Sequence, residues 1–259
     1  MTQAAEAETE PGTAHPPSRR DRLRAATMEE IIQTARRLLV RSGPEAMSLR
    51  AIAREMGMTA PGLYRYFDSH EALNRHICAG IFTELNDDIR RAIQAAPVPA
   101  EATDLVTAKL TVKTVAACRE FRRWSLTHQA EFGLLFGVPL PGFDNGRNDV
   151  ADECALAFAG TFLGLFLELW NVAPFPVPQA ADIDPGLRDQ LLRYRDALGT
   201  DLPVGAVLTF LRCWTVLYGA VAMEVFGHLR FALEDPAPMF ELTLADLARL
   251  IGLRYPLQP

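Results

Sequence analysis

The chain has 259 residues, of which 49% are hydrophobic and 22% charged, and its formal net charge is −6. This length can bury a sizeable core, and this composition excludes wholesale disorder. The charge is uneven: residues 1–18 carry −3, residues 19–80 carry +4 and residues 81–259 carry −7. We therefore expect a disordered tail over 1–18, a small basic domain over 19–80 and a larger acidic domain over 81–259 with a separate task.

The sequence predicts a cytoplasmic protein with no membrane partner. Residues 1–17 lack an apolar core and an early positive charge, so they do not resemble a secretory signal. The most apolar run, 155–167, has about thirteen residues, whereas a membrane-spanning helix needs roughly 20. The four cysteines lie far apart without C-x-x-C spacing, which predicts buried free thiols in a reducing compartment.

Apolar residues recur at helical spacing from Arg19 onward without useful strand alternation, which predicts an all-α fold. We expect the first helix to begin at Thr27, because Thr27 and Glu30 form a T-x-x-E capping box. Ser48 is expected to cap a second short helix that Gly57 ends. A third helix is expected over 59–67, and a fourth, capped by Asp68 or Ser69, reaches about residue 95. Longer helices are expected near 101–118, 120–136, 149–172, 185–198, 203–229 and 238–253.

Residues 48–67, SLRAIAREMGMTAPGLYRYF, carry the strongest functional signal. Two short helices that cross closely need a small residue at their contact and a turn residue that tolerates positive φ. Ala53 and Gly57 meet these needs. The apolar residues fall where such a helix-turn-helix unit packs on a supporting helix: Leu49, Ile52, Met56, Met58 and Leu63. The alternative is a plain helical hairpin in a bundle core.

The residues around this unit suit contact with DNA. A recognition helix needs slim residues where it enters the major groove, and Thr59, Ala60, Pro61 and Gly62 are slim. Tyr64, Arg65 and Tyr66 follow with groups that can reach phosphates or bases. A basic arm precedes the unit, comprising Arg19, Arg20, Arg22 and Arg24, and such arms follow phosphates or enter the minor groove. The alternative for this arm is a solvated run of charge.

Residues 27–75 resemble the DNA-binding domain of TetR-type transcriptional regulators. The match includes SLRAIAREMGM, TAPGLYRYF and DSHEAL, with the L-Y-x-[HY]-F signature at 63–67. The resemblance implies recognition-helix contacts from Thr59, Pro61, Gly62, Tyr64 and Tyr66, with Ser48, Leu49 and Arg50 opening the second helix and Thr27 starting the first. With the arm and the slim residues, the candidate DNA contacts are Arg22, Arg24, Thr27, Ser48, Leu49, Arg50, Thr59, Ala60, Pro61, Gly62, Tyr64, Arg65, Tyr66 and His70. His70 stands where the family usually has a phosphate-binding Lys.

Two later segments resemble a regulator C-terminal domain named for a Trp-His-Gly motif. They are EFGLLFGVPLPGF, residues 131–143, and WTVLYGAVAMEVFGHL, residues 214–229. Tyr218 replaces the His of the motif. The resemblance implies a helical bundle that serves for regulation and dimerisation.

Aromatic residues recur at four-residue steps on two expected helices, Trp124 to Phe132 and Phe158 to Trp170. If Gly160 and Gly164 leave space between these stripes, they bound a pocket for a small apolar effector. The candidate ligand-binding residues are Trp124, His128, Phe132, Phe158, Phe162, Glu168 and Trp170. The alternative is that the stripes pack together as core. Glu168 and Glu224 lie in apolar runs and are expected to be buried, with Arg212 as the partner of Glu224.

The resemblance implies a homodimer that binds double-stranded operator DNA of pseudo-palindromic sequence and represses transcription until a small apolar ligand releases it. We expect dimerisation through 203–229 and 238–253, whose leucines and valines exceed one bundle face. One alternative is a DNA-binding dimer without small-molecule control. The other is a helical enzyme or carrier with a vestigial helix-turn-helix. No catalytic residues, metal site or cofactor are expected, because the histidines are scattered and H-x-x-x-H and G-x-S-x-G are missing.

Overall fold

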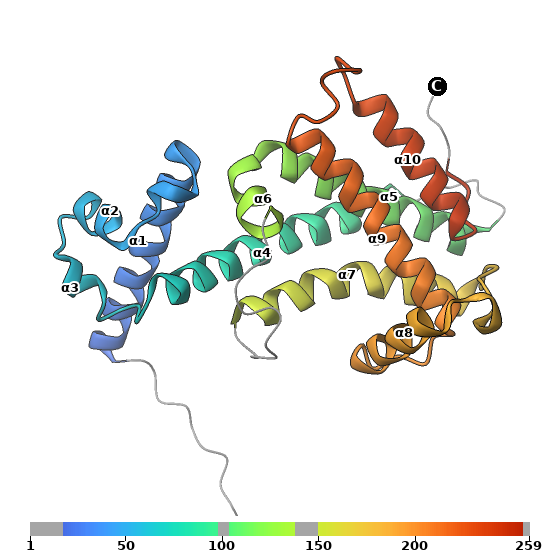
Figure 1. The fold of residues 1–259 in the computed structure, drawn as a ribbon, viewed down its shortest axis with the longest axis horizontal. Coiled ribbons are helices and arrows are strands. Elements are labelled where there is room, and N and C mark those ends of the chain that lie inside the picture. Colours follow the sequence, from blue (N-terminus) through green and yellow to red (C-terminus); the bar gives the residue numbers. More distant parts are fainter. Residues whose placement is uncertain (1–17, 98–103, 138–149, 256–259) are drawn as a thin grey trace, which may run out of the picture. The chain divides into compact units, whose positions relative to one another are not determined.

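The computed structural model describes residues 18–97, 104–137 and 150–255 (Figure 1). These residues form helices, turns and loops and no strand, so the predicted all-α class is confirmed. The chain divides into two compact units, one ending at Leu73 and the other beginning at Asn74, within helix α4. The domain boundary predicted after residue 80 falls in the same helix. Residues 1–17 of the tail expected over 1–18 lie outside the described residues, and Ser18 is the N-cap of α1.

The first unit contains α1 (Arg19–Ser42), the 3-10 helix η1 (Pro44–Ala46), α2 (Leu49–Glu55), α3 (Ala60–Leu63) and the first turn of α4 (His70–Ala95). Its core is formed by apolar side chains from each of the α-helices, and these are almost completely buried. They include Ile31, Leu38, Leu39, Ile52, Leu63, Phe67 and Leu73. Of the five apolar residues that predicted a helix-turn-helix unit, Leu49, Ile52 and Leu63 are buried in this core, and Met56 and Met58 are half-buried.

Helix α1 begins eight residues before the predicted start. Ser18 caps it, because its side chain accepts a hydrogen bond from the Asp21 N–H at 3.2 Å while the Asp21 carboxylate accepts one from the Ser18 N–H. Thr27 lies inside the helix and its hydroxyl donates to the Leu23 carbonyl at 3.0 Å. The capping box predicted at Thr27 is therefore wrong, since the same spacing also occurs within a continuous helix.

The caps predicted at Ser48 and Ser69 are confirmed, and Thr59 caps the helix that was expected to begin there. The hydroxyl groups of Ser48, Thr59 and Ser69 accept hydrogen bonds from backbone N–H groups at the starts of α2, α3 and α4. Gly57 has a φ of 65°, which allows the turn between α2 and α3 without the strain that a Cβ would cause. Helix α3 ends at Leu63 instead of Phe67, and residues 64–66 continue as turns.

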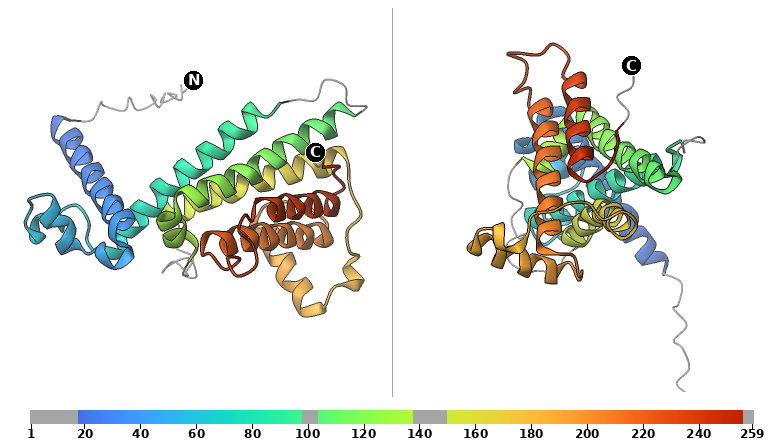
Figure 2. Two further views of the ribbon diagram at one scale, coloured as in Figure 1. Left: turned by 90° about the horizontal axis from the view of Figure 1, so that it is seen from above. Right: turned by 90° about the vertical axis from the view of Figure 1, so that its right-hand side faces the viewer.

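The second unit contains the rest of α4 and α5 (Leu105–Thr127), α6 (Gln129–Phe136), α7 (Val150–Val172), the 3-10 helix η2 (Ala180–Asp182), α8 (Pro185–Ala197), α9 (Val204–Val225) and α10 (Ala237–Leu250). Helices α5 and α7 pack side by side, and α9 pairs with α10 (Figure 2). The expected break near residue 119 is wrong, because α5 continues to Thr127 and the break falls at His128, whose φ and ψ are −124° and 50°.

Helices α7 and α9 are long and apolar enough, by length and composition alone, to span a membrane. Each buries one face in the second unit, through residues such as Phe158, Leu169 and Leu217. Their opposite faces are apolar and exposed: Leu156 on α7 is 65% exposed and Val216 on α9 is 45% exposed. The described structure therefore leaves two apolar helix faces without cover.

Candidate nucleic-acid interface and apolar pocket

Helix α3 presents a slim, polar surface. Leu63 and Phe67 are anchored in the core, whereas Thr59, Pro61 and Arg65 are exposed and Tyr64 is 51% exposed. Ala60, Gly62 and Tyr66 are half-buried beside them. Small side chains at the start of the helix and hydroxyl and guanidinium groups after it suit entry into a major groove.

The basic arm is helical and lies against this surface. Arg19, Arg20, Arg22 and Arg24 all belong to the first turns of α1 and are exposed. The Arg24 guanidinium lies over the Tyr66 ring, 5.4 Å from its centroid, which is a cation–π distance. This contact brings the start of α1 next to the end of the recognition segment.

Two predicted DNA contacts have restricted side chains. Leu49 is only 7% exposed and packs in the core, so its side chain cannot reach DNA, while its neighbours Ser48 and Arg50 are exposed. The His70 Nε2 lies 2.7 Å from the Met47 carbonyl oxygen, to which it donates a hydrogen bond. The His70 ring therefore ties the start of α4 to the residue before the Ser48 cap.

In the second unit, the two aromatic stripes pack against other rings. Trp124 is fully buried and stacks on His128 with ring centroids 4.7 Å apart. Phe132 and Phe158 are buried and both contact Phe121. The expectation that these four residues line a cavity between the stripes is therefore wrong, because aromatic rings occupy that space.

The other members of the predicted set also have different surroundings. Glu168 is exposed, so the expectation that it is buried is wrong. Trp170 packs on Phe175, with ring centroids 5.1 Å apart. Gly160 and Gly164 lie on the exposed face of α7 with nothing near the position of a Cβ, and they do not open an internal space. Of the predicted ligand-binding residues, Phe162 lines the pocket described next.

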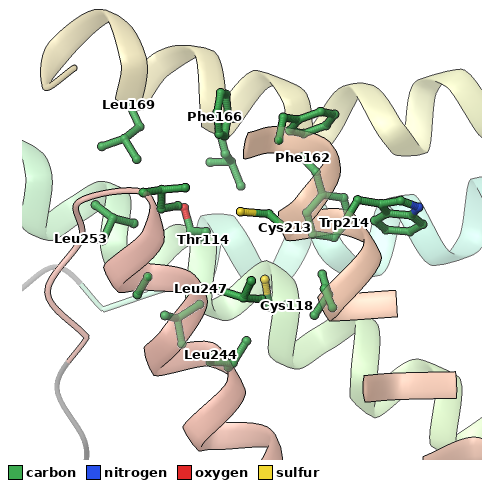
Figure 3. Close-up of a pocket in the computed structure, with 16 residues that line it drawn as sticks. Thr114, Cys118, Phe162, Phe166, Leu169, Cys213, Trp214, Leu244, Leu247 and Leu253 are labelled. Carbon is green, nitrogen blue, oxygen red and sulfur yellow. The ribbon is translucent and has the colours of Figure 1, made fainter. Parts of the chain in front are cut away.

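An apolar pocket lies between four helices of the second unit, with about 730 Å³ of atom-free space, its mouth included. Figure 3 shows Cys213 between the α7 side chains and Leu247 of α10, with Cys118 beside Leu247. The lining comprises Thr114, Val115 and Cys118 of α5, Phe162, Leu165, Phe166 and Leu169 of α7, Phe210, Cys213, Trp214 and Leu217 of α9, Leu244, Leu247 and Ala248 of α10, and Ile251 and Leu253.

The pocket offers no ionised group at neutral pH. Burial raises the pKa of the Cys118 thiol to about 12, with a smaller contribution from Cys213. Burial likewise raises the pKa of Cys213 to about 11, so both thiols stay protonated. The Thr114 hydroxyl and the indole N–H of Trp214 are the other polar groups of the lining. Among the described residues, no cluster of three or more His, Cys, Asp or Glu could hold a metal ion.

Ion pairs fasten the helices around the pocket. Glu224 of α9 accepts a 2.7 Å hydrogen bond from Arg122 of α5, and the Glu224 side chain is only 8% exposed. The prediction that Arg212 pairs with Glu224 is therefore wrong, while the predicted burial of Glu224 is correct. Arg119 donates to Glu241 at 2.9 Å and to the Tyr255 hydroxyl at 2.7 Å, which holds the segment after α10 beside the pocket.

Comparisons with known proteins identify both units. Residues 31–77 match the family described as bacterial regulatory proteins, tetR family, and residues 114–247 match the tetracyclin repressor-like C-terminal domain. The HTH-type transcriptional regulators Rv1816 of Mycobacterium tuberculosis and Mb1846 of Mycobacterium bovis are each 27% identical over 214 residues, covering 82% of this chain and 86% of the relative.

Solved structures agree with this assignment. The regulatory protein SCO4313 has a TM-score of 0.64 and 26% identity, covering 89% of this chain and 98% of that one. A Rhodococcus protein of unknown function shares the fold, with a TM-score of 0.57 and 18% identity, covering 88% of this chain and 95% of that one. The chain belongs to the TetR family, and it is a transcriptional regulator with a helix-turn-helix DNA-binding domain.

Proposed function

We propose that this chain is a homodimeric repressor that binds a pseudo-palindromic operator and leaves it when a small apolar molecule occupies the pocket of the second unit. The observation that carries the proposal is the pocket itself, because it is apolar, bounded by four helices and lined by Trp214. The proposed DNA contacts are the candidate residues predicted from the sequence, except for Leu49, whose side chain is buried.

Ring contacts support a route from the pocket to α4. Trp214 stacks on Tyr218, and the Tyr218 hydroxyl donates a 2.9 Å hydrogen bond to the Phe136 carbonyl at the end of α6. The Phe136 ring meets Phe82 of α4 edge-on, with centroids 5.8 Å apart. Helix α4 is the element that the two units share in the chain. A ligand that favours one arrangement of these rings would lower operator affinity by its difference in binding free energy.

The outward faces of α7 and α9 support the homodimer. Monomers rarely expose large apolar patches, and these faces include Leu156, Val216 and Met223. Gly160 and Gly164 leave room for a partner helix to approach closely. The pair of helices first expected, α9 and α10, fits less well, because several of their apolar residues are already used within one subunit: Val221, Val225 and Leu247.

Sedimentation at micromolar concentration tests the dimer. The wild type should sediment at twice 28.6 kDa. Leu156→Arg should shift it to the monomer, since a charge would enter an apolar interface. Leu187→Arg is the matched control, because Leu187 of α8 is 40% exposed outside the proposed interface and should leave the dimer intact. A wild type that stays monomeric would overturn the dimer proposal.

Release is tested with a duplex obtained by selection from random DNA. Neutral apolar compounds that raise the melting temperature of the protein should also lower the fluorescence anisotropy of the labelled duplex–protein complex. Compounds that stabilise the protein yet leave every complex intact would instead favour a DNA-binding dimer without small-molecule control. Failure to enrich any duplex would overturn the DNA-binding proposal.

A further inference from the structure

We infer that the pocket between α5, α7, α9 and α10 selects an uncharged aromatic molecule. This inference rests on the proposed ligand release and adds the chemical class of the ligand. It starts from the lining of the pocket, which combines a wall of aromatic rings, two protonated sulfur groups and a wall of leucines.

The surroundings of the pocket exclude a charged ligand. An ionised group moved from water into an apolar site loses its favourable solvation unless a partner charge or several hydrogen bonds replace the water. Two cations of the surrounding helices are engaged, Arg119 with Glu241 and Arg122 with Glu224. Arg212, whose charge acts on Cys213, is exposed to solvent and is not part of the lining. The lining has no ionised group and offers only the Thr114 hydroxyl, the two thiols and the indole N–H of Trp214, so carboxylates and ammonium groups are rejected.

The aromatic preference follows from one wall. Phe162 and Phe166 of α7 and Phe210 and Trp214 of α9 contribute rings, and they pack on one another in edge-to-face or tilted pairs: Phe166 with Phe210 at 5.3 Å and Phe162 with Trp214 at 6.1 Å. A flat guest ring extends such a cluster, and aromatic pairs gain free energy beyond the area that they bury.

The thiols strengthen this preference. Sulfur atoms make favourable contacts with aromatic rings, and Cys118 and Cys213 line the pocket from two different helices. Across from the ring wall, Leu244 and Leu247 offer only aliphatic contact. A saturated guest of the same size would bury as much area but gain neither the ring–ring nor the sulfur–ring contacts.

Three probes that share a fused two-ring skeleton separate the effect of aromaticity from the effect of charge. They are 2-naphthol, its saturated analogue decahydro-2-naphthol, and 2-naphthoate. Isothermal titration calorimetry of the full-length protein at neutral pH, without DNA, gives their dissociation constants. We expect 2-naphthol to bind at least about tenfold more tightly than either of the others. Equal binding of the saturated alcohol, tighter binding of the naphthoate, or no binding of 2-naphthol would each overturn the inference.

Two variants assign the binding to this pocket. Leu247→Trp should fill the space and weaken 2-naphthol at least about tenfold, whereas Leu250→Trp, at another half-buried leucine of α10 outside the lining, should not. Thr114→Lys introduces a cation at the lining and should shift the preference toward 2-naphthoate by about tenfold or more. Binding of 2-naphthol that survives both Leu247→Trp and Thr114→Lys would place it elsewhere and overturn the inference.

The inference and the proposed function fail separately. Binding is measured without DNA, and release is measured with the labelled duplex. If 2-naphthol binds with the expected selectivity while the duplex stays bound, the ligand class stands and the release mechanism fails. If selective binding is missing while other apolar compounds release the duplex, the release mechanism stands and the ligand class fails.

Discussion

The Tyr218 hydroxyl donates a 2.9 Å hydrogen bond to the backbone carbonyl of Phe136. The bond joins the middle of α9 to the end of α6, and the Tyr218 ring also stacks on Trp214 at the pocket. Tyr218 stands where the Trp-His-Gly motif has its His, so the substituted residue still makes a specific polar contact between two helices. Removing this hydrogen bond therefore tests whether DNA release can be lost while ligand binding is kept.

Tyr218→Phe should uncouple the pocket from the DNA-binding unit. The variant keeps the ring stack and loses one hydrogen bond, so the free energy of unfolding should fall by about 1 kcal/mol. Ligand affinity should stay within about twofold, while ligand-induced release, followed by anisotropy, should weaken clearly. Tyr194→Phe, at a half-buried tyrosine of α8, serves as the control. Unchanged release in Tyr218→Phe would remove this bond from the mechanism.

Tyr64→Ala should reduce operator affinity by about 10- to 100-fold without loss of stability. Tyr64 is 51% exposed, so its removal should change the free energy of unfolding by less than about 0.5 kcal/mol. Its loss removes a contact of the reading surface. Titration of a labelled operator measures the effect, with Val40→Ala, a 59% exposed residue of α1, as the control. Full affinity in Tyr64→Ala would contradict the assignment of the reading surface.

The exposed arginines at the start of α1 should contribute affinity for any duplex. Each phosphate that an arginine neutralises adds about 0.9 to the slope of log affinity against log salt. Arg22→Ala combined with Arg24→Ala should therefore lower that slope by roughly 1 to 2 for specific and random duplexes alike. Arg188→Ala, on α8 of the second unit, should leave it unchanged. A double variant with the wild-type slope would show that these arginines do not contact phosphates.

Breaking the buried Arg122–Glu224 pair should destabilise the protein strongly. The Glu224→Gln variant leaves a guanidinium that is only 21% exposed without its countercharge, which costs about 3–5 kcal/mol. Asp246→Asn, in an exposed pair with Arg249, should cost less than about 1 kcal/mol. Chemical denaturation measures both. Arg212→Ala should behave like the exposed control, and a loss as large as that of Glu224→Gln would restore Arg212 as the partner.

The Arg119–Glu241–Tyr255 cluster should make stability depend on pH. Burial tends to raise the pKa of Glu241, but hydrogen bonds from Arg119 and Tyr255 outweigh it and hold the pKa below its usual value. A lowered folded-state pKa stabilises the protein above the unfolded value of about 4.3, and this contribution disappears as pH falls through the folded value. The stability difference between wild type and Glu241→Gln should therefore shrink from neutral pH toward about pH 3.

Glu234→Gln, at an exposed carboxylate, is the control for this titration. Its stability should follow that of the wild type across the same range. A wild-type advantage over Glu241→Gln that persists undiminished in acid would contradict the role of the Glu241 carboxylate.

The first unit could be predicted from the sequence because its signals are local. Ser48 and Ser69 cap their helices as expected, and Leu49, Ile52 and Leu63 of the predicted apolar set are buried. The start of α1 could not be predicted in this way, since the Thr27 capping pattern is satisfied inside a helix that begins at Ser18.

The pocket of the second unit depends on contacts between distant helices. Four-residue spacing predicts that Trp124, His128 and Phe132 share a face, but it does not specify whether an opposite ring or a space lies in front of them. Rings of Phe121, Phe136 and Tyr218 lie against Phe132. The partner of Glu224 likewise depends on how α5 approaches α9, and Arg122 reaches it from 102 positions away in the chain.

Dimeric, sequence-specific DNA binding is measured by selecting duplexes from a random pool with the full-length protein and sequencing those that bind. We expect one enriched motif made of two inverted half-sites at a fixed separation, because a two-fold dimer presents two recognition segments to the same face of the duplex. Enrichment should disappear with Tyr64→Ala and persist with Val40→Ala. A pool that shows no enrichment, or an enriched single half-site without its inverted copy, would contradict a dimeric, sequence-specific regulator.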